Sequence, residues 1–155
     1  MFDISDELQS LVAAFDENHI DYALCGGMAM AVHGHLRMTI DIDLLILSES
    51  LDSVFAIAKS LGYNIKGRDM SFAEGVIEIR RLSKIDPDDG ELLSLDFLLV
   101  TPKILKVWET RAGAEWQGRR LSVVSADGLI ILKELRGSAQ DRADIEALKG
   151  RSDES

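Results

Sequence analysis

The sequence has one cysteine, no long apolar run and few basic residues. A lone Cys25 excludes an internal disulfide and a cysteine-based zinc site. Because Cys25 ends the apolar run IDYALC, we expect a buried thiol rather than a nucleophile. No apolar run approaches the roughly 20 residues that a membrane-spanning helix needs, so we expect no membrane partner. The acidic start, MFDISDELQ, lacks the basic and apolar segments of a signal peptide, which predicts a cytoplasmic protein.

The chain is acidic, with 27 Asp and Glu against 17 Lys and Arg and a formal net charge of −10. Stable non-specific binding to nucleic acid depends on Lys and Arg side chains that neutralise phosphates, so this charge argues against it. A small local basic site remains compatible with the composition. The length of 155 residues suits a single domain, which we expect over residues 1–149, with a disordered tail over 150–155.

Hydrophobic periodicity and turn residues predict helices that alternate with strands. Helices are expected over 5–15 (with Ser5 as the N-cap), 27–35, 51–62, 102–111, 125–137 and 138–150, and strands over 19–26, 39–47, 75–82, 92–100 and 119–125. The turn-rich segment SKIDPDDGE predicts an antiparallel hairpin between the third and fourth strands. This order predicts an α+β fold: a small mixed β-sheet flanked by helices, with the C-terminal helices (126–149) packed on it.

Two aspartates interrupt the apolar strand TIDIDLLIL. Side chains alternate along a strand with a period of two, so Asp41 and Asp43 share a face with Leu45. Two ionised carboxylates this close raise each other's pKa unless a cation lies between them. Mg²⁺ prefers such hard oxygen ligands, often together with substrate phosphates. The alternative is an edge strand that turns both carboxylates to water, and the pair alone leaves both interpretations open.

A third carboxylate, Asp96, lies within the apolar stretch LLSLDFLLV, where a carboxylate is rarely buried without a partner. The expected strand places it on a face with Ser94 and Leu98. If this strand neighbours the one that carries Asp41 and Asp43, the three carboxylates converge. Three carboxylates can hold two Mg²⁺ ions about 3.5–4 Å apart, as in phosphoryl displacement. The alternative for Asp96 is a strand-end residue that caps a loop.

Two glycines, Gly26 and Gly27, separate an expected strand from the alanine- and methionine-rich helix that follows it. Glycine lets the backbone turn sharply and approach a ligand closely. A helix that begins there presents free N–H groups, which suit a phosphate. Many tight turns look the same, but Asp41 and Asp43 lie on the next strand, which would place phosphate binder and metal ligands together.

The stretch LCGGMAMAVHGHLRMTIDIDLLI, followed by Asp96, resembles the nucleotidyltransferase superfamily with the DNA polymerase β-like fold. The shared pattern is a glycine pair, a spacer, Asp-x-Asp in an apolar strand and a later third carboxylate. LRMTIDIDL is similar to the branch that includes AbiE-type toxins, and antibiotic nucleotidyltransferases have similar stretches. The resemblance implies a polymerase β palm-like fold. It also implies transfer of a nucleoside monophosphate from an NTP, such as ATP or GTP, to a hydroxyl acceptor with release of pyrophosphate.

The resemblance also implies roles for the residues that match its pattern. Asp41 and Asp43 would hold Mg²⁺, and two ions are expected in the active complex. Asp96 would bind the second ion or act as general base on the acceptor hydroxyl. Gly26 and Gly27 would hold the triphosphate. The acceptor would be a small molecule, a protein or tRNA, presented by a protein partner or by a second subunit of a homo-oligomer.

Three further residues have weaker support. Arg37 and Thr39 precede the aspartates and would contact phosphates or brace the loop, although a solvated arginine is an equal alternative. Lys133 lies in the apolar helix LIILKELRG. The toxin branch often has a nucleotide-directed lysine in a comparable helix, but Lys133 could equally begin the polar face of an amphipathic helix.

The C-terminal segment departs from the family pattern. The branch commonly carries an R-x-K-D element before its last helix, whereas SAQD places Ser138 and Gln140 at the basic positions. Arg142 is a nearby cation that could replace them. This departure makes a non-catalytic subunit or regulator, such as one member of a toxin–antitoxin pair, the main alternative. A two-metal phosphodiesterase or nuclease is a third reading, because two-metal carboxylate sites also serve hydrolysis.

Overall fold

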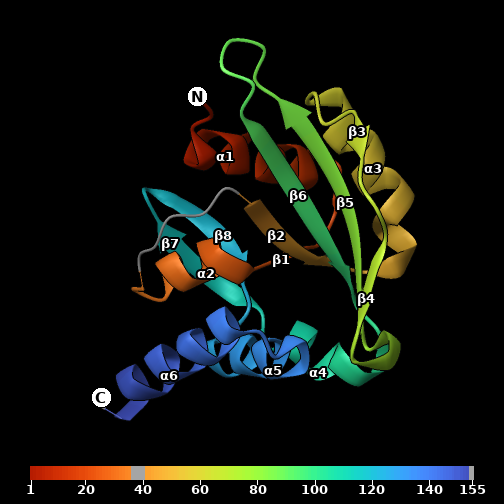
Figure 1. Cartoon of the computed structure of the whole chain (residues 1–155). Coiled ribbons are helices and arrows are strands. Elements are labelled where there is room, and N and C mark those ends of the chain that lie inside the picture. The colour runs from red at the N-terminus through yellow and green to blue at the C-terminus, as the bar shows by residue number, and fades with distance from the viewer. Residues whose placement is uncertain (36–40, 154–155) are drawn as a thin grey trace.

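The computed structural model describes residues 1–35 and 41–153, with side chains described as far as residue 150. Helices and strands alternate along the chain as the periodicity predicted, and together they form an α+β fold with one mixed sheet (Figure 1). No helix in the described residues is both long and apolar enough to span a membrane.

The described residues form one eight-stranded mixed sheet with the order β3-β5-β6-β2-β1-β8-β7, and β4 pairs with the edge of β5. The strands are β1 (Ala23–Cys25), β2 (Asp41–Ile46), β3 (Ile65–Lys66), β4 (Met70–Phe72), β5 (Ile77–Ile85), β6 (Leu92–Leu99), β7 (Ala112–Trp116) and β8 (Arg119–Val123). The β2–β6 and β1–β8 pairs are parallel, and the other pairs are antiparallel. The predicted hairpin is confirmed as β5 and β6.

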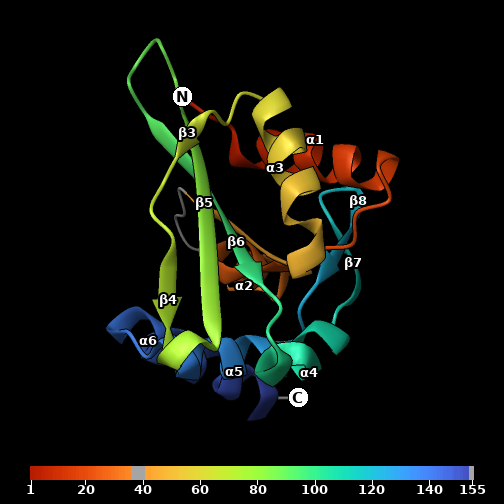
Figure 2. The same cartoon turned by 90° about the vertical axis from the view of Figure 1, so that its right-hand side faces the viewer.

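The helices lie against the two faces and one end of this sheet. They are α1 (Ile4–Glu17), α2 (Gly26–Val32), α3 (Leu51–Ser60), α4 (Leu105–Glu109), α5 (Ala126–Arg136) and α6 (Ala139–Asp153). Figures 1 and 2 show α1 and α3 together on one face, while α5 and α6 lie side by side at the lower end. Phe55 of α3 contacts Phe97 of β6 with ring centroids 6.0 Å apart, so the core lies between these helices and the central strands.

Several boundaries differ from the sequence prediction. The first helix is capped by Asp3 rather than by Ser5, because the Asp3 carboxylate accepts a hydrogen bond from the Asp6 N–H at 3.2 Å. The last helix continues to Asp153, whereas the tail was expected to be disordered from Gly150. The short strands β3, β4 and β7 were missed, since segments such as AGAEW lack the apolar alternation that marks a half-buried strand.

The cap at the start of α1 gives a stability prediction. Asp3→Ala should lower the free energy of unfolding by about 0.5–2 kcal/mol, because an N–H of the first turn loses its acceptor. Ser5→Ala is the matched control and should not lower it. Urea denaturation of the two variants and the wild type measures the difference. Equal losses in both variants would contradict the capping assignment.

Candidate functional site

Asp43 and Asp96 lie side by side at the centre of the sheet. Strand β2 pairs with β6 in parallel, in a register that places Asp43 opposite Asp96 and Asp41 opposite Ser94. The two strands are therefore neighbours, which was the condition for the three carboxylates to converge. Because alternate side chains share a face, Asp41, Asp43 and Asp96 project from the same side of adjacent strands. Asp96 is buried, and the other two are partly buried.

Gly26 makes room for Asp43. Strand β1 pairs with β2 so that Cys25 lies opposite Asp43, and the chain then turns at Gly26 with a φ of +68°. A Cβ atom added to Gly26 would lie 2.0 Å from Asp43 Oδ2 and 2.7 Å from Asp43 Cβ. A side chain at residue 26 and the observed Asp43 side chain therefore exclude each other. The phosphate-binding role expected of Gly26 stays a prediction. The space that Asp43 requires at Gly26 was not foreseen from the sequence.

Burial, together with mutual repulsion, raises the pKa values of Asp41 and Asp43. Burial, followed by the charges of Asp96 and Asp41, raises the pKa of Asp43 to about 7. Burial and the Asp96 charge also raise the pKa of Asp41. Hard oxygen donors in this arrangement fit Mg²⁺, for which one or two carboxylates plus phosphates are a common ligand set.

Asp96 is engaged by an arginine that the sequence reasoning missed. Arg81, opposite Asp96 on β5, donates from Nε to Oδ1 at 2.6 Å and from an Nη to Oδ2 at 2.9 Å. This bidentate pair raises the pKa of Arg81. Among the residues described, no three His, Cys, Asp or Glu side chains are arranged as they stand to hold a metal ion. The pairing could have been found only from the register of the β5–β6 hairpin.

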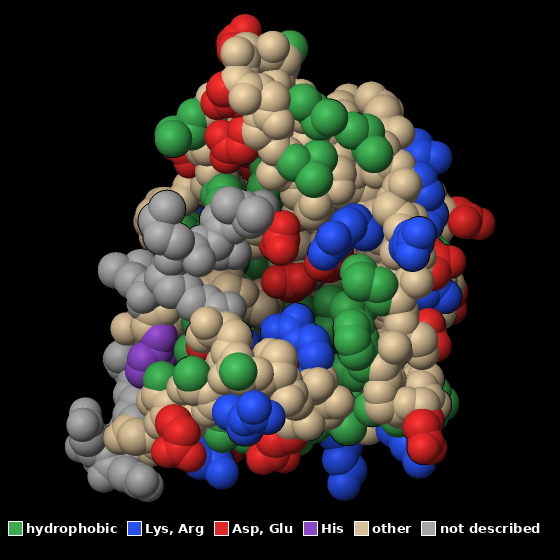
Figure 3. Space-filling model, viewed as in Figure 1, with side chains coloured by type: hydrophobic (Ala, Val, Ile, Leu, Met, Phe, Trp, Pro, Cys, Tyr) green, Lys and Arg blue, Asp and Glu red, His purple; other side chains and the backbone are tan. Residues whose placement is uncertain are grey.

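A small cavity connects Asp43 with two cations of α5. Its lining includes Gly26 and Asp43 on the sheet side, with Lys133 and Arg136 on the helix side. The cavity has a volume of about 30 Å³. Apolar side chains complete the lining: Ile77, Ile79, Leu98, Leu129 and Leu132. In Figure 3, acidic, basic and hydrophobic side chains meet in a hollow near the centre of this face.

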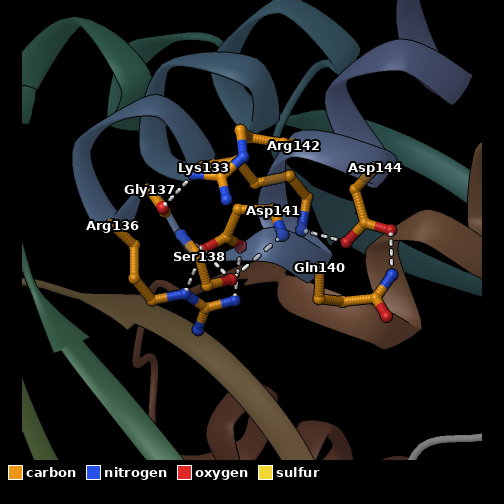
Figure 4. Close-up of polar contacts among 8 residues, drawn as sticks. All are labelled: Lys133, Arg136, Gly137, Ser138, Gln140, Asp141, Arg142 and Asp144. Atoms are coloured by element: carbon orange, nitrogen blue, oxygen red, sulfur yellow. Dashed lines mark hydrogen bonds and ion pairs between the residues drawn. The ribbon is translucent and has the colours of Figure 1, made fainter.

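Carboxylates of α6 hold both cations in place (Figure 4). The buried Lys133 Nζ lies 2.9 Å from Asp144 Oδ2. Arg136 donates to both oxygens of Asp141, from Nε at 2.8 Å and from an Nη at 2.6 Å. Burial alone would raise the pKa of Asp141, but hydrogen bonds from Arg136 and Ser138 lower it to about 2. Lys133 thus faces the cavity from within a buried pair, and it does not begin a solvated polar face.

Arg136 is the second residue that the sequence reasoning missed. The family pattern places its basic residues at positions 138 and 140, where this chain has Ser138 and Gln140, and so gave no reason to consider Arg136. Arg142 was suggested as their replacement, but its guanidinium donates to the Gly137 carbonyl at 3.0 Å and does not line the cavity. The spacing of Lys133 and Arg136, three residues apart, places both on one helix face and was the signal available in the sequence.

The remaining candidates are only partly placed. Arg37 and Thr39 lie outside the described residues, so their phosphate-binding roles stay predictions. Gly27 is buried in the first turn of α2, and its role in holding phosphate is likewise a prediction.

Solved structures of other proteins share this arrangement of elements. TM1012 of Thermotoga maritima, assigned to the nucleotidyltransferases, has a TM-score of 0.63 at 16% identity, covering 98% of this chain and 94% of its own. ANT(2″)-Ia in complex with adenylyl-2″-tobramycin has a TM-score of 0.56 at 17% identity, with 95% and 97% covered. The lincomycin-bound lincosamide antibiotic adenylyltransferase LnuA has a TM-score of 0.57 at 15% identity, with 93% and 95% covered.

The chain has the nucleotidyltransferase fold. The likeness extends over nearly the full length of both partners in each comparison. No protein-family model matches the sequence, and no curated protein matches it. At 15–17% identity the nucleotidyltransferase likeness establishes the fold and leaves the reaction to be argued from the site.

The close approach of Gly26 to Asp43 predicts a large cost for a single methyl group. Gly26→Ala should lower the free energy of unfolding by about 1–3 kcal/mol more than Gly118→Ala, because overpacking adds to backbone strain. Gly118 is a matched control, since its φ is +75° and a Cβ there would meet nothing within 4 Å. Urea denaturation gives both values. Equal losses would mean that Asp43 moves aside freely, and Asp43→Gly should reduce the excess cost of Gly26→Ala.

The raised pKa of Asp43 predicts a pH-dependent gain from its neutral isostere. The carboxyl binds its proton more tightly in the folded chain (pKa about 7) than at its ordinary value of 3.8, so the fold loses stability as the pH rises from about 4 to about 7. In EDTA, Asp43→Asn should therefore raise the free energy of unfolding at pH 8, by up to about 4 kcal/mol. The gain should shrink as the pH falls from 7 toward 4.

Thermal unfolding across this pH range measures the effect. The exposed Asp88→Asn in the hairpin turn is the control for a lost negative charge. A gain for Asp43→Asn that is the same at pH 5 and pH 8 would show that repulsion at Asp43 is not its cause.

Proposed function

We propose that this chain is a Mg²⁺-dependent nucleotidyltransferase that moves a nucleoside monophosphate from an NTP to a hydroxyl acceptor. One observation carries the proposal: Asp43, seated over Gly26 and beside Asp96, shares a cavity with Lys133 and Arg136. The site thus pairs an acidic wall, suited to a metal, with a cationic wall, suited to phosphates. The nucleotidyltransferase fold supports this reading.

The acidic wall would bind the metal. Asp41, Asp43 and Asp96 supply the hard carboxylate oxygens that Mg²⁺ prefers, and two ions fit this number of ligands. When bound, Mg²⁺ would supply charge neutralisation at the phosphates and would offset the burial and the repulsion that raise the pKa of Asp43. Gly26 leaves the space that the Asp43 side chain occupies.

The cationic wall would hold the triphosphate. Lys133 and Arg136 line the cavity, where Asp144 pairs with Lys133, and Asp141, which also lines the cavity, pairs with Arg136. Phosphoryl-type transfer depends mainly on such positioning and charge stabilisation. The acceptor oxygen attacks the α-phosphorus, the bond to the β-phosphate oxygen breaks, and pyrophosphate leaves. A carboxylate of the acidic wall, with Asp96 as the candidate, takes the hydroxyl proton.

The acceptor is the least constrained part of this proposal. ANT(2″)-Ia and LnuA are solved with antibiotic-derived ligands, which makes a small-molecule hydroxyl one candidate class. A protein hydroxyl is a second class, and a partner protein or second subunit would then complete the site. The net charge of −10 disfavours tRNA as a stand-alone substrate. The acidic composition fits an acceptor that is small or is delivered by a partner.

A non-catalytic role is the second candidate, and a specific observation favours it. Each cation at the site already has an internal carboxylate partner: Arg81 pairs with Asp96, Lys133 with Asp144 and Arg136 with Asp141. A site so neutralised could bind a nucleotide, or a partner, without turning it over. Such a subunit would suit a regulatory pair of the toxin–antitoxin kind.

The first experiment compares thermal unfolding with each NTP, with and without Mg²⁺, for the wild type and Asp41→Asn/Asp43→Asn. An NTP at a hundred times its Kd should stabilise the wild type by about 2.7 kcal/mol, which corresponds to several degrees. The shift should require Mg²⁺ and vanish in the double variant. Pyrophosphate release with fractionated cell extract then separates the enzyme from the non-catalytic subunit, which would bind NTP without release.

A matched pair of arginine variants tests the cationic wall in the same assay. Arg136→Gln should weaken NTP binding about tenfold, since it removes a charged phosphate ligand. Arg142→Gln should leave it unchanged, because Arg142 does not line the cavity. If no NTP shifts the unfolding temperature of the wild type, the nucleotidyltransferase proposal fails for the isolated chain. Equal effects of the two variants would argue against the cationic wall but would leave the rest of the nucleotidyltransferase proposal standing.

A further inference from the structure

Arg81 covers the carboxylate that the metal site needs as its third ligand. Its guanidinium donates to both oxygens of Asp96, at 2.6 and 2.9 Å, and the pair lies on directly opposed positions of β5 and β6. Asp96 is only 6% exposed, so the guanidinium occupies much of its accessible side. A bidentate arginine–carboxylate pair is among the stronger hydrogen-bonded ion pairs in proteins.

The backbone of the β3–β4 segment fixes Arg81 from the other side. The Gly67 N–H donates to the Arg81 carbonyl at 3.0 Å. A Cβ at Gly67 would lie only 3.0 Å from both Cβ and Cγ of Arg81 and 3.1 Å from its Cδ. The glycine backbone therefore packs directly on the aliphatic stem of the arginine. This packing restrains the Arg81 side chain and positions its guanidinium.

The neighbouring arginine shows that this placement is specific to residue 81. Arg80 follows the same strand but projects from its opposite face, where it pairs with Glu78 at 3.3 Å and Asp69 at 3.6 Å. Of these two neighbouring arginines, Arg81 is therefore the one that brings its charge to the face that carries Asp41, Asp43 and Asp96. That charge and a divalent cation compete for the same carboxylate.

We propose that Arg81 is a built-in counter-cation, which holds Asp96 in the nucleotide-free chain and weakens binding of a divalent cation at the three-aspartate site. The proposal rests on the metal site of the proposed function. In the nucleotide-free chain Asp96 stays with Arg81. The full metal complement binds only when NTP phosphates add ligands and negative charge. Arg81 is thus a positioning residue that couples metal loading to the presence of the nucleotide.

The test measures the binding of Mn²⁺ alone to the full chain. Binding is monitored as the loss of the electron paramagnetic resonance signal of free Mn²⁺. A charge within about 4–6 Å shifts a carboxyl's proton affinity by about 1–3 pKa units. By the same electrostatics, Arg81→Met and Arg81→Gln should each bind Mn²⁺ at least tenfold more tightly than the wild type. The Arg80→Met control should stay within about twofold. Two substitutions at residue 81 guard against one that fails to fold.

A second substitution locates the effect. In an Asp96→Asn background, Arg81→Met should no longer tighten Mn²⁺ binding, because the contested carboxylate is gone. Unchanged or weaker binding in both Arg81 variants, or a gain that persists with Asp96→Asn, would overturn the proposal. The proposed metal site would survive that result if wild-type binding still depended on Asp43. Binding that is absent in every variant, or unaffected by Asp41→Asn/Asp43→Asn, would instead refute the metal site itself.

A measurement on the unmodified chain completes the test. The Arg81 Nε–H signal of ¹⁵N-labelled protein should move on addition of Mg²⁺ together with a non-hydrolysable NTP analogue, as Asp96 changes partner. Mg²⁺ alone at the same concentration should move it much less. A signal that stays unchanged while the analogue is bound would contradict exchange at Asp96.

Discussion

The missing side chain at residue 26 is the constraint on which the rest of the site depends. Asp43 can occupy its position only because the turn between β1 and α2 leaves space where a Cβ would stand. That turn begins one residue after the β1–β2 pairing that fixes the height of Asp43 in the sheet. The parallel pairing with β6 then sets Asp96 at the same level. The strand register thus sets the level of both carboxylates, and the space at Gly26 lets Asp43 face the cavity.

Around this centre, positive and negative groups balance in pairs. Arg81 faces Asp96 from the sheet, while Lys133 and Arg136 face Asp144 and Asp141 between the last two helices. Removing one partner of a buried ion pair leaves the other charge buried and unpaired, which is strongly destabilising. Each pair therefore holds its own two side chains in place. Among the described residues Asp43 makes no ion pair, and it carries the most strongly raised carboxyl pKa of the site. The imbalance marks where a metal would act.

Short-range patterns in the sequence predicted much of this architecture, and long-range pairings supplied the rest. The Asp41–Asp43 alternation predicted a shared face, and the apolar context of Asp96 predicted a strand, although its neighbourhood with the first strand was left as a condition. Arg81 was not predictable, since its partner depends on the register of a hairpin with a long turn. Lys133 was singled out for its apolar helix, whereas Arg136, three residues further along the same face, was overlooked. Asp3 displaced Ser5 as the cap through a one-residue shift in the helix start.

The sheet order carries a consequence for how the molecule comes into being. Strand β1 lies between β2 and β8, and its parallel partner at Leu24 is Val123, almost a hundred residues further along the chain. The cavity also joins residues near position 26 with residues near 136. Contacts so distant in sequence form late and cooperatively, since the closure of long loops costs entropy before it is compensated. A nascent chain would therefore lack the assembled site until its last helices have emerged from the ribosome. A chain truncated before these helices would lack it altogether.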